Sequence, residues 1–334
     1  MTPTEPSGAG DPAGGTAGGS EEAALGDNAA AVEFEEHRHH LFGVAYRMLG
    51  SVAEAEDAVQ ETWLRWAAAD RAGITSPRGW LTTVISRLSV DRLRSAQHRR
   101  EAYVGPWLPE PIVRSEVGPA GPAPDPAEHA ELADSLSIAF LTMLERLDPV
   151  ERAAFLLREV FGHGYDEVAP MVDRSEVACR QIVHRAKERL GPDRPVRFDP
   201  GPQEERRLVD SFLTAAMTGD VDGLREVLAE DVIAWNDGGP ERRAARKPVI
   251  GVDRVTTFVI NIAGRSERLG DAVSFHHARV NEAPGVVVEA DGFVSLVLAF
   301  DIGPDGIRTF HTMLNPAKLA HVRLEPTESG PATP

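Results

Sequence analysis

A proline-rich segment at residues 101–127 divides this chain and limits how it can fold. It holds seven prolines, and proline neither continues a helix nor donates to a sheet ladder. Before it, residues 34–100 carry apolar side chains at helical spacing, and helical spacing returns after it. A second stretch, at 191–202, holds four prolines and precedes a block with strand-like runs. The chain is therefore expected to fold as several blocks.

The chain has 334 residues, which is enough for two or three domains. Its first residues are rich in Gly, Ala, Pro and Ser and carry five carboxylates but no Lys or Arg, which is typical of a disordered tail. We expect a disordered tail at 1–28, an all-α domain at 29–100, the linker at 101–127, a second all-α domain at 128–191, a short linker at 192–202, an α+β domain at 203–325 and a second tail at 326–334.

The composition excludes several classes of protein. No run of 18 apolar residues is present, so no membrane span is expected, and the N-terminus lacks the features of a secretory signal. Cys179 is the only cysteine, which excludes an internal disulfide and a cysteine zinc site. We expect a cytoplasmic protein without metal or cofactor. The net charge of −17 argues against indiscriminate nucleic-acid binding, so any DNA contact must come from local basic faces.

Residues 165–190 have the pattern of a helix-turn-helix. Within them, Cys179, Val183, Ala186 and Leu190 form the apolar stripe of a second helix. The opposite side carries the candidate DNA-contacting residues Ser175, Glu176, Arg180, Gln181, His184, Arg185 and Lys187. Arg and Gln can make bidentate contacts to guanine and adenine edges in the major groove. A solvated basic face on a bundle helix fits the same pattern.

A second basic face is expected on the helix that starts at Ser76-Pro77, where serine is the N-cap and proline opens the first turn. Its inward stripe contains Leu81, Ile85 and Leu88. The candidate DNA-contacting residues are Arg78, Trp80, Arg87, Asp91, Arg92, Arg94 and His98. Trp80 is either a core residue or an aromatic platform on which an unpaired base stacks.

The last block changes from helical to strand-like patterns. Helices are expected at 203–218, 221–229 and 251–264. The runs "DVIAW", "AVSFHHARV", "GVVVEA", "GFVSLVLAF" and "GIRTFHTML" are typical of strands, and turn signals such as Asp291-Gly292 separate them. Helices followed by an antiparallel meander indicate an α+β domain.

Two segments resemble the sigma-70 family of transcription initiation factors. "LFGVAYRMLGSVAEAEDAVQETWLRW" with "PRGWLTTVISRLSVDRLRS" resembles region 2, and "LERLDPVERAAFLLREVFGHGYDEVAPMVDRSEVACRQIVHRAKERL" resembles region 4. Two such regions without a region 3 are the layout of the extracytoplasmic-function group. The peptide "WLPEP" and the last block are similar to members that carry a SnoaL-like cone domain. The resemblance covers about residues 34–325 and implies an RNA polymerase sigma factor, regulated in cis by that domain.

The resemblance implies roles for particular residues. Asp57, Gln60, Glu61 and Leu64 would dock on the β′ clamp helices of the polymerase core. The 78–98 helix would read and help to open the −10 promoter element, and the 175–190 helix would read the −35 element. Asp173 stands where glycine is common in the helix-turn-helix, and Pro170 should cost its first helix a hydrogen bond to Asp166.

The peptide Trp107-Leu108-Pro109-Glu110-Pro111 needs a partner, because tryptophan and leucine are costly to expose. The family's DGGG-type and NPDKL-type motifs match Asp237-Gly238-Gly239-Pro240 and Asn315-Pro316-Ala317-Lys318-Leu319. We expect the peptide to dock near these two loops. The alternative is that it packs on its own parent domain.

Two other functions fit parts of the sequence. Some SnoaL-like proteins are polyketide cyclases, so a cyclase- or isomerase-type enzyme with DNA-targeting helices is one; its acid/base candidates are Asp237, His276, His277, Asp301 and His311. His276 and His277 would face opposite sides of a strand, and no nucleophile–base pair is visible, so catalysis is not expected. The other is a helix-turn-helix repressor that senses a small-molecule ligand in the C-terminal pocket. His37, His39 and His40 are interpreted as a polar helix end rather than a metal site.

Overall fold

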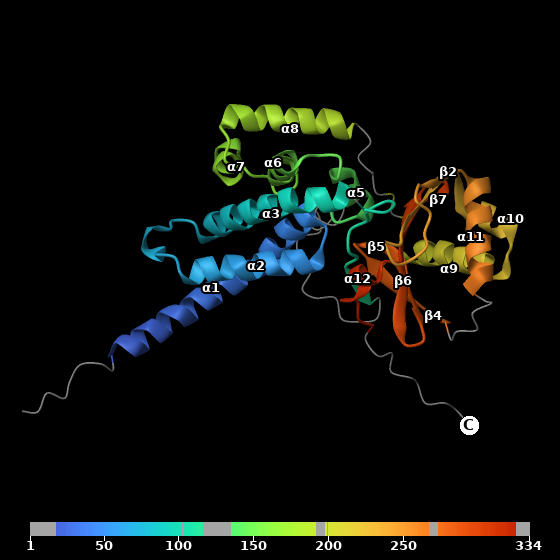
Figure 1. The fold of residues 1–334 in the computed structure, drawn as a ribbon, viewed down its shortest axis with the longest axis horizontal. Coiled ribbons are helices and arrows are strands. Elements are labelled where there is room, and N and C mark those ends of the chain that lie inside the picture. Colours follow the sequence, from blue (N-terminus) through green and yellow to red (C-terminus); the bar gives the residue numbers. More distant parts are fainter. Residues whose placement is uncertain are drawn as a thin grey trace, which may run out of the picture.

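The structure is a computed structural model that describes residues 18–101, 103–115, 135–191, 198, 200–266 and 273–324, with the backbone alone at 18–27, 97–101, 115 and 265–266. Its helices are α1 (Gly18–Leu49), α2 (Val52–Ala67), α3 (Pro77–Glu101), α5 (Ile138–Leu144), α6 (Pro149–Glu159), α7 (Tyr165–Val172), α8 (Glu176–Leu190), α9 (Pro202–Thr218), α10 (Val221–Val227), α11 (Val252–Ser266) and α12 (Pro316–Leu319), with a short 3-10 turn, η1 (Arg71–Gly73). Its strands are β1 (Val113–Ser115), β2 (Leu228–Asp237), β3 (Val249–Ile250), β4 (Val273–Val280), β5 (Ala283–Ala290), β6 (Phe293–Gly303) and β7 (Gly306–Met313). Figure 1 shows a helical half and a sheet half lying side by side.

The first helical domain, α1–α3, differs from the sequence prediction at its start. Helix α1 begins at Gly18, so residues 18–28, which the sequence assigned to a tail, are helical. Within this stretch, the run Glu21-Glu22-Ala23-Ala24-Leu25 consists of residues that favour helix. The predicted break and restart are present, because η1 follows α2 and α3 begins at Pro77.

The second helical domain, α5–α8, follows the capping signals in the sequence. Asp148 and Glu151 form a capping box at the start of α6. Helix α7 continues through Pro170 to Val172 and ends where Asp173 adopts a left-handed conformation, with φ of 54°. The expected start of this second helical domain, at residue 128, lies outside the described residues.

The two helical domains share one hydrophobic core, which the division into separate blocks did not predict. Apolar residues of α1–α3 and of α5–α8 form a single buried cluster. Helix α3 lies between α1 and α2 on one side and α6 and α7 on the other (Figure 1). The two domains are therefore held against each other in this structure.

The sheet has seven strands in the order β1-β4-β5-β6-β7-β2-β3. Strands β4 to β7 form the predicted antiparallel meander, and β2 runs parallel to β7. Strand β1 was not predicted: it comes from the proline-rich linker and pairs antiparallel with β4, with Val113 opposite Val280. The linker is thus part of the sheet.

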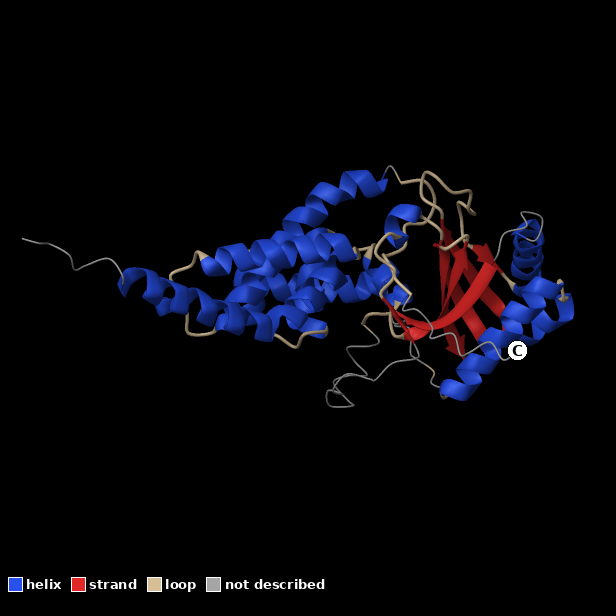
Figure 2. Ribbon diagram, turned by 90° about the horizontal axis from the view of Figure 1, so that it is seen from below, coloured by secondary structure: helices blue, strands red, loops and turns tan. Residues whose placement is uncertain are grey.

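The two faces of the sheet have different partners. Helices α9, α10 and α11 cover one face (Figure 2), where the rings of Phe212, Phe300 and Phe310 pack with centroids 5.2–6.2 Å apart. The other face turns toward the linker and the helical half (Figure 2). Its buried residues include Ala278, Val280, Val287, Val297, Ala299 and Met313.

Candidate functional site

Asp237, at the end of β2, is the centre of the junction between the linker and the sheet. Its side chain is fully buried. One carboxylate oxygen accepts from the Tyr103 hydroxyl at 2.5 Å and the backbone N–H of Gly239 at 3.1 Å. The other accepts from the backbone N–H of Leu108 at 2.9 Å and from Lys318 Nζ at 2.7 Å. Four donors thus compensate the buried charge.

Lys318, in α12, is the cation of this junction and is also buried. Besides its ion pair with Asp237, it donates to the carbonyl oxygen of Leu108. Its Nζ lies 4.1 Å from the centroid of the Trp107 ring and 4.9 Å from that of Tyr103. Such cation–π contacts strengthen when the charge is removed from water. Burial and the neighbouring Asp237 raise the pKa of Tyr103, which keeps its hydroxyl protonated.

The two predicted loops are shaped to approach each other closely. Asn315 caps α12 by accepting from Ala317 N–H at 3.1 Å and donates to the Tyr103 hydroxyl at 2.8 Å, while Pro316 occupies the first turn. A Cβ atom on Gly238 would lie 2.4 Å from the carbonyl oxygen of Arg242. Gly239 has φ of 59°, and its added Cβ would lie 2.5 Å from Asn315 Nδ2. Neither glycine tolerates a side chain here.

The peptide 107–111 contacts both halves of the molecule. Leu108 is fully buried in the core cluster on the linker side of the sheet, and Pro109 and Pro111 are also buried. Trp107 packs on Gly50 of the first helical domain, where an added Cβ would lie 2.6 Å from the indole ring. The expected docking near the two loops and its alternative, packing on the parent domain, therefore occur together.

Glu110 faces the first helical domain. Its backbone N–H donates to Gly50 O at 2.9 Å. Its carboxylate accepts from the N–H of Val52 at 2.7 Å and the hydroxyl of Ser51 at 2.8 Å. These groups form the start of α2, where unpaired N–H groups and the helix dipole favour an anion. Glu110 therefore caps α2 from outside the helix.

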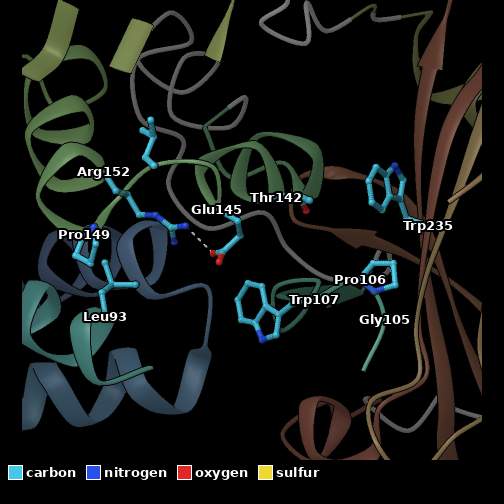
Figure 3. Close-up of a pocket in the computed structure, with 10 residues that line it drawn as sticks. Leu93, Gly105, Pro106, Trp107, Thr142, Glu145, Pro149, Arg152 and Trp235 are labelled. Atoms are coloured by element: carbon cyan, nitrogen blue, oxygen red, sulfur yellow. Dashed lines mark hydrogen bonds and ion pairs between the residues drawn. The ribbon is translucent and has the colours of Figure 1, made fainter. Parts of the chain in front are cut away.

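A cavity of about 440 Å³ lies where the linker, both helical domains and the sheet meet (Figure 3). It is lined by Leu93, Gly105, Pro106, Trp107, Thr142, Glu145, Leu147, Pro149, Arg152 and Trp235. Arg152 and Glu145 form an ion pair of 2.7 Å in its wall, and Trp107 and Trp235 lie on different sides (Figure 3). The sequence left open a ligand pocket in the last domain; there the rings of Phe212, Phe300 and Phe310 pack against one another on the helix-covered face of the sheet.

The candidate basic face on α3 is partly engaged within the protein. Arg87 donates to the carbonyl oxygen of Pro170 in α7 at 2.6 Å. Arg92 pairs with Glu61 at 3.2 Å and Asp57 at 3.8 Å. Arg78 is exposed, and Asp91 and Arg94 pair with each other at 3.2 Å. Trp80 is half-buried, and the centroid of its ring lies 5.4 Å from that of Trp66. The side chain of His98 lies outside the described residues. The structure thus places Trp80 on the core and ties Arg87 and Arg92 to residues outside α3.

The face of α8 is open to solvent. Ser175, Glu176, Arg180, Gln181, His184, Arg185 and Lys187 are all exposed. Ser175 is the N-cap and accepts from the N–H of Ala178 at 3.2 Å. Arg180 lies 4.6 Å from the centroid of the Tyr165 ring, which orients its guanidinium, and Lys187 pairs with Glu159 at 2.7 Å. The structure brings all seven candidates onto one surface.

On α2, the candidate docking residues form an acidic and apolar surface. Asp57 and Gln60 are exposed, and Leu64 exposes 66% of its surface. Glu61 pairs with Arg65 at 2.8 Å as well as with Arg92. An exposed leucine among carboxylates suits a protein partner with basic and apolar groups.

Comparisons with known proteins decide the family. The family model for "Sigma-70 region 2" matches residues 34–99, and the family model for "Sigma-70, region 4" matches residues 137–190. The chain is 41% identical over 234 residues to the extracytoplasmic-function (ECF) RNA polymerase sigma factor SigJ of Mycobacterium tuberculosis, covering 70% of this chain and 73% of that protein. It is 34% identical over 292 residues to a probable ECF sigma factor, SigI, of the same organism, covering 86% and 94%. This chain belongs to the ECF RNA polymerase sigma factors.

The solved structures agree with this assignment. The crystal structure of M. tuberculosis SigJ matches with a TM-score of 0.67 and 33% identity, over 88% of this chain and 100% of that one. The predicted fold class is confirmed: region 2 is α1–α3, region 4 is α5–α8, and a SnoaL-like domain follows. As an ECF sigma factor, the protein directs the polymerase core to promoter DNA and acts as a transcription factor.

Sequence reasoning missed several residues of the junction. Tyr103 donates to Asp237 and Tyr46 donates to Glu110 of the linker, yet only the aromatic character of Tyr103 within a linker gave a signal. Arg152 and Asn281 are buried at domain boundaries, and no sequence pattern marked them.

The enzyme candidates of the SnoaL-like domain do not form one site. His277 pairs with Asp210 of α9 at 2.7 Å and His276 with Glu289 at 3.6 Å, so they face opposite sides of β4, as predicted. Among the described residues, no group of three or more His, Cys, Asp or Glu could hold a metal ion.

In the first helical domain, burial lowers the pKa of His40 to about 4, which keeps its ring neutral beside Arg78. No helix in the described part of the chain is long and apolar enough to cross a membrane.

Asp301 is expected to make the stability of this sigma factor depend on pH. Its carboxylate lies 3.8 Å from His311, and burial raises the pKa of Asp301 to about 7 and lowers that of His311 to about 3. A carboxyl whose folded pKa exceeds its unfolded value stabilises the fold at low pH, and that stabilisation is lost as the pH rises from about 4 to 7.

We therefore expect Asp301→Asn, which cannot ionise, to equal the parent protein at pH 4 and to exceed its free energy of unfolding at pH 8 by roughly 1–3 kcal/mol. Denaturant unfolding at both pH values measures this. Asp305→Asn, at an exposed position two residues beyond the end of β6, is the control and should show no such difference. Equal stability of Asp301→Asn and the parent at pH 8 would contradict the assignment.

Proposed function

We propose that this sigma factor is regulated in cis, by docking of its linker on the SnoaL-like domain. The observation that carries the proposal is the Asp237 carboxylate, which binds the linker through Leu108 N–H and Tyr103 and its own domain through Lys318 and Gly239. The same linker caps α2 of region 2 through Glu110. Docking therefore fixes region 2 relative to the SnoaL-like domain.

The docked arrangement also restrains promoter recognition. We assign the −10 element to α3 and the −35 element to α8, in line with the exposed polar residues on α8. In the docked arrangement, Arg87 of α3 is bound to Pro170 of region 4, and α3 packs against α6 and α7. Separation of regions 2 and 4 would free Arg87 for the phosphate or base contacts that arginine makes with DNA.

We assign core binding to α2, whose exposed Asp57, Gln60 and Leu64, with Glu61 beside them, would dock on the β′ clamp helices. Arg92 reaches this surface through its pairs with Asp57 and Glu61, so the −10 helix and the docking helix are electrostatically linked. The work of such a protein is done in the cytoplasm, where the polymerase acts on DNA.

Run-off transcription with purified bacterial core enzyme tests the proposal. We expect Trp107→Ala to give several-fold more promoter-dependent transcript than the parent protein. The reason is that truncation removes the cation–π contact with Lys318 and the packing on Gly50, a contribution of roughly 1–3 kcal/mol to docking.

The control is Val104→Ala, because Val104 is an exposed residue of the same linker. A second tryptophan, Trp63, cannot serve as the control because it packs on the core of region 2. Transcript unchanged by Trp107→Ala would refute docking as the regulatory contact. Sequence-specific DNA binding in the absence of core enzyme, with no effect on initiation in its presence, would favour the repressor instead.

A further inference from the structure

The turn between β4 and β5 is unusual because its first residue, Asn281, is buried. Asn281 and Glu282 form a two-residue hairpin turn in which both have positive φ, 51° and 64°. Asparagine is favoured at such positions. Hairpin turns normally lie at the surface, but Asn281 exposes only 2% of its surface. The turn is inserted between the SnoaL-like domain and the sigma domains.

Every hydrogen-bonding group of the Asn281 side chain has a partner outside its own domain. Oδ1 accepts from the backbone N–H of Ile112 in the linker at 2.9 Å. Nδ2 donates to the Tyr46 hydroxyl of α1 at 2.7 Å and to the carbonyl oxygen of Leu136, just before α5, at 2.8 Å. The backbone N–H of Asn281 also donates to Ile112 O at 2.9 Å. One residue thus contacts region 2, the linker and region 4.

The contact with Tyr46 continues to the docking helix. The Tyr46 hydroxyl donates to the carbonyl oxygen of Glu110 at 2.6 Å. The Glu110 carboxylate in turn caps the first turn of α2. A hydrogen-bonded chain therefore runs from Asn281 through Tyr46 and Glu110 to α2, the helix assigned to core binding. The Asp237 junction lies at the other end of the peptide and shares none of these hydrogen bonds.

We propose that Asn281 is an interdomain latch through which the SnoaL-like domain holds region 2, the linker and region 4 at once, and through which it keeps the cap of α2 in place. The latch rests on the proposed cis regulation but is a separate contact from Asp237. Its chemistry requires an amide. An aspartate would direct a second acceptor at Leu136 O, and a residue without a side-chain carbonyl would leave the buried N–H of Ile112 unpaired.

Asn281→Gly is the matched test, because glycine retains the positive φ and the backbone bond to Ile112 O but removes the three side-chain bonds. Asp291→Gly is the control: Asp291 also has positive φ, 54°, in the next hairpin turn, but it is exposed. Hydrogen–deuterium exchange of the full-length protein is measured for the peptides that cover 46–55 and 107–115. We expect exchange at the start of α2 and at Ile112 to accelerate at least about tenfold in Asn281→Gly, since three side-chain hydrogen bonds are lost. Asp291→Gly should exchange as the parent does.

Tyr46→Phe keeps the ring in the core and removes only the hydroxyl, so it tests the same chain in case Asn281→Gly fails to fold. It should accelerate exchange at the start of α2, and adding Asn281→Gly to it should have less than the additive effect there. Parent-like exchange at the start of α2 and at Ile112 in a folded Asn281→Gly protein, or in Tyr46→Phe, overturns the latch.

Affinity for purified core enzyme is measured on the same proteins. Faster exchange together with several-fold tighter core binding supports both the latch and cis regulation. Faster exchange with unchanged core binding supports the latch as a contact and refutes its control of core binding. Failure of the proposed cis regulation itself is read from Trp107→Ala, so the two failures are distinguishable.

Discussion

Asp237→Asn is expected to lower the free energy of unfolding of the full-length protein by roughly 3–5 kcal/mol, the usual cost of removing one member of a buried ion pair. All four groups around the carboxylate are donors: Tyr103, Leu108 N–H, Gly239 N–H and Lys318. An amide is the same size but replaces one acceptor with a donor, so at least one of these groups loses its partner. Lys318, which is buried, would lose its ion pair with Asp237.

Denaturant unfolding measures the loss, and limited proteolysis of the linker reports whether it is released. Asp222→Asn, at an exposed position on α10 of the same domain, is the control and should leave both unchanged. We also expect Asp237→Asn to increase promoter-dependent transcription with core enzyme at temperatures where the variant remains folded. A variant that unfolds like the parent, with a protected linker, would show that the ion pair does not hold the linker.

The parts of the fold that were predictable are those set by local chemistry. The capping box at Asp148 and Glu151, the restart at Pro77 and the meander of β4 to β7 each depend on residues close together in the sequence. The same holds for the positive φ of Asp173, which followed from its place in the helix-turn-helix.

The parts that were not predictable depend on contacts between distant segments. Strand β1 has only three residues, and it is a strand because β4 offers an unpaired edge, not because its own residues demand it. Arg92 has the spacing of a DNA-contacting residue, yet α2 places Asp57 and Glu61 within reach of it. Asn281 has the sequence signature of an ordinary hairpin turn, and only the assembly of three domains around it makes it a buried contact.

The apolar peptide 107–111 was the strongest sequence signal for the junction, and different residues of it make the contacts with the sheet and with α2. Leu108 supplies the buried apolar anchor on the sheet, whereas Glu110 supplies the cap on α2. Because both belong to one short peptide with prolines on either side of Glu110, displacement of the anchor should disturb the cap. This coupling gives the SnoaL-like domain a route to the core-binding helix that does not require it to contact α2 directly.

Arg152 bridges regions 2 and 4, and we expect its substitution to have the second of the two largest effects. This arginine exposes 3% of its surface and donates to Met48 O at the end of α1 at 2.8 Å, to Leu144 O at 3.1 Å and to Glu145 at 2.7 Å. Arg152→Met keeps an apolar stem of similar length but leaves two buried carbonyl groups and a carboxylate without this donor. We expect the free energy of unfolding to fall by roughly 3–5 kcal/mol.

Guanidinium-chloride unfolding followed by tryptophan fluorescence measures this change, and small-angle X-ray scattering below the transition reports whether regions 2 and 4 separate. Arg146→Met is the control, because Arg146 is exposed in the connection between α5 and α6, three residues before the start of the helix that carries Arg152. If Arg152→Met instead unfolds within about 0.5 kcal/mol of the parent, which is the usual range for surface substitutions, the guanidinium does not hold the regions together. The shared apolar core would then be sufficient to keep α3 against α6 and α7, and release of Arg87 for promoter DNA would have to be driven by the polymerase.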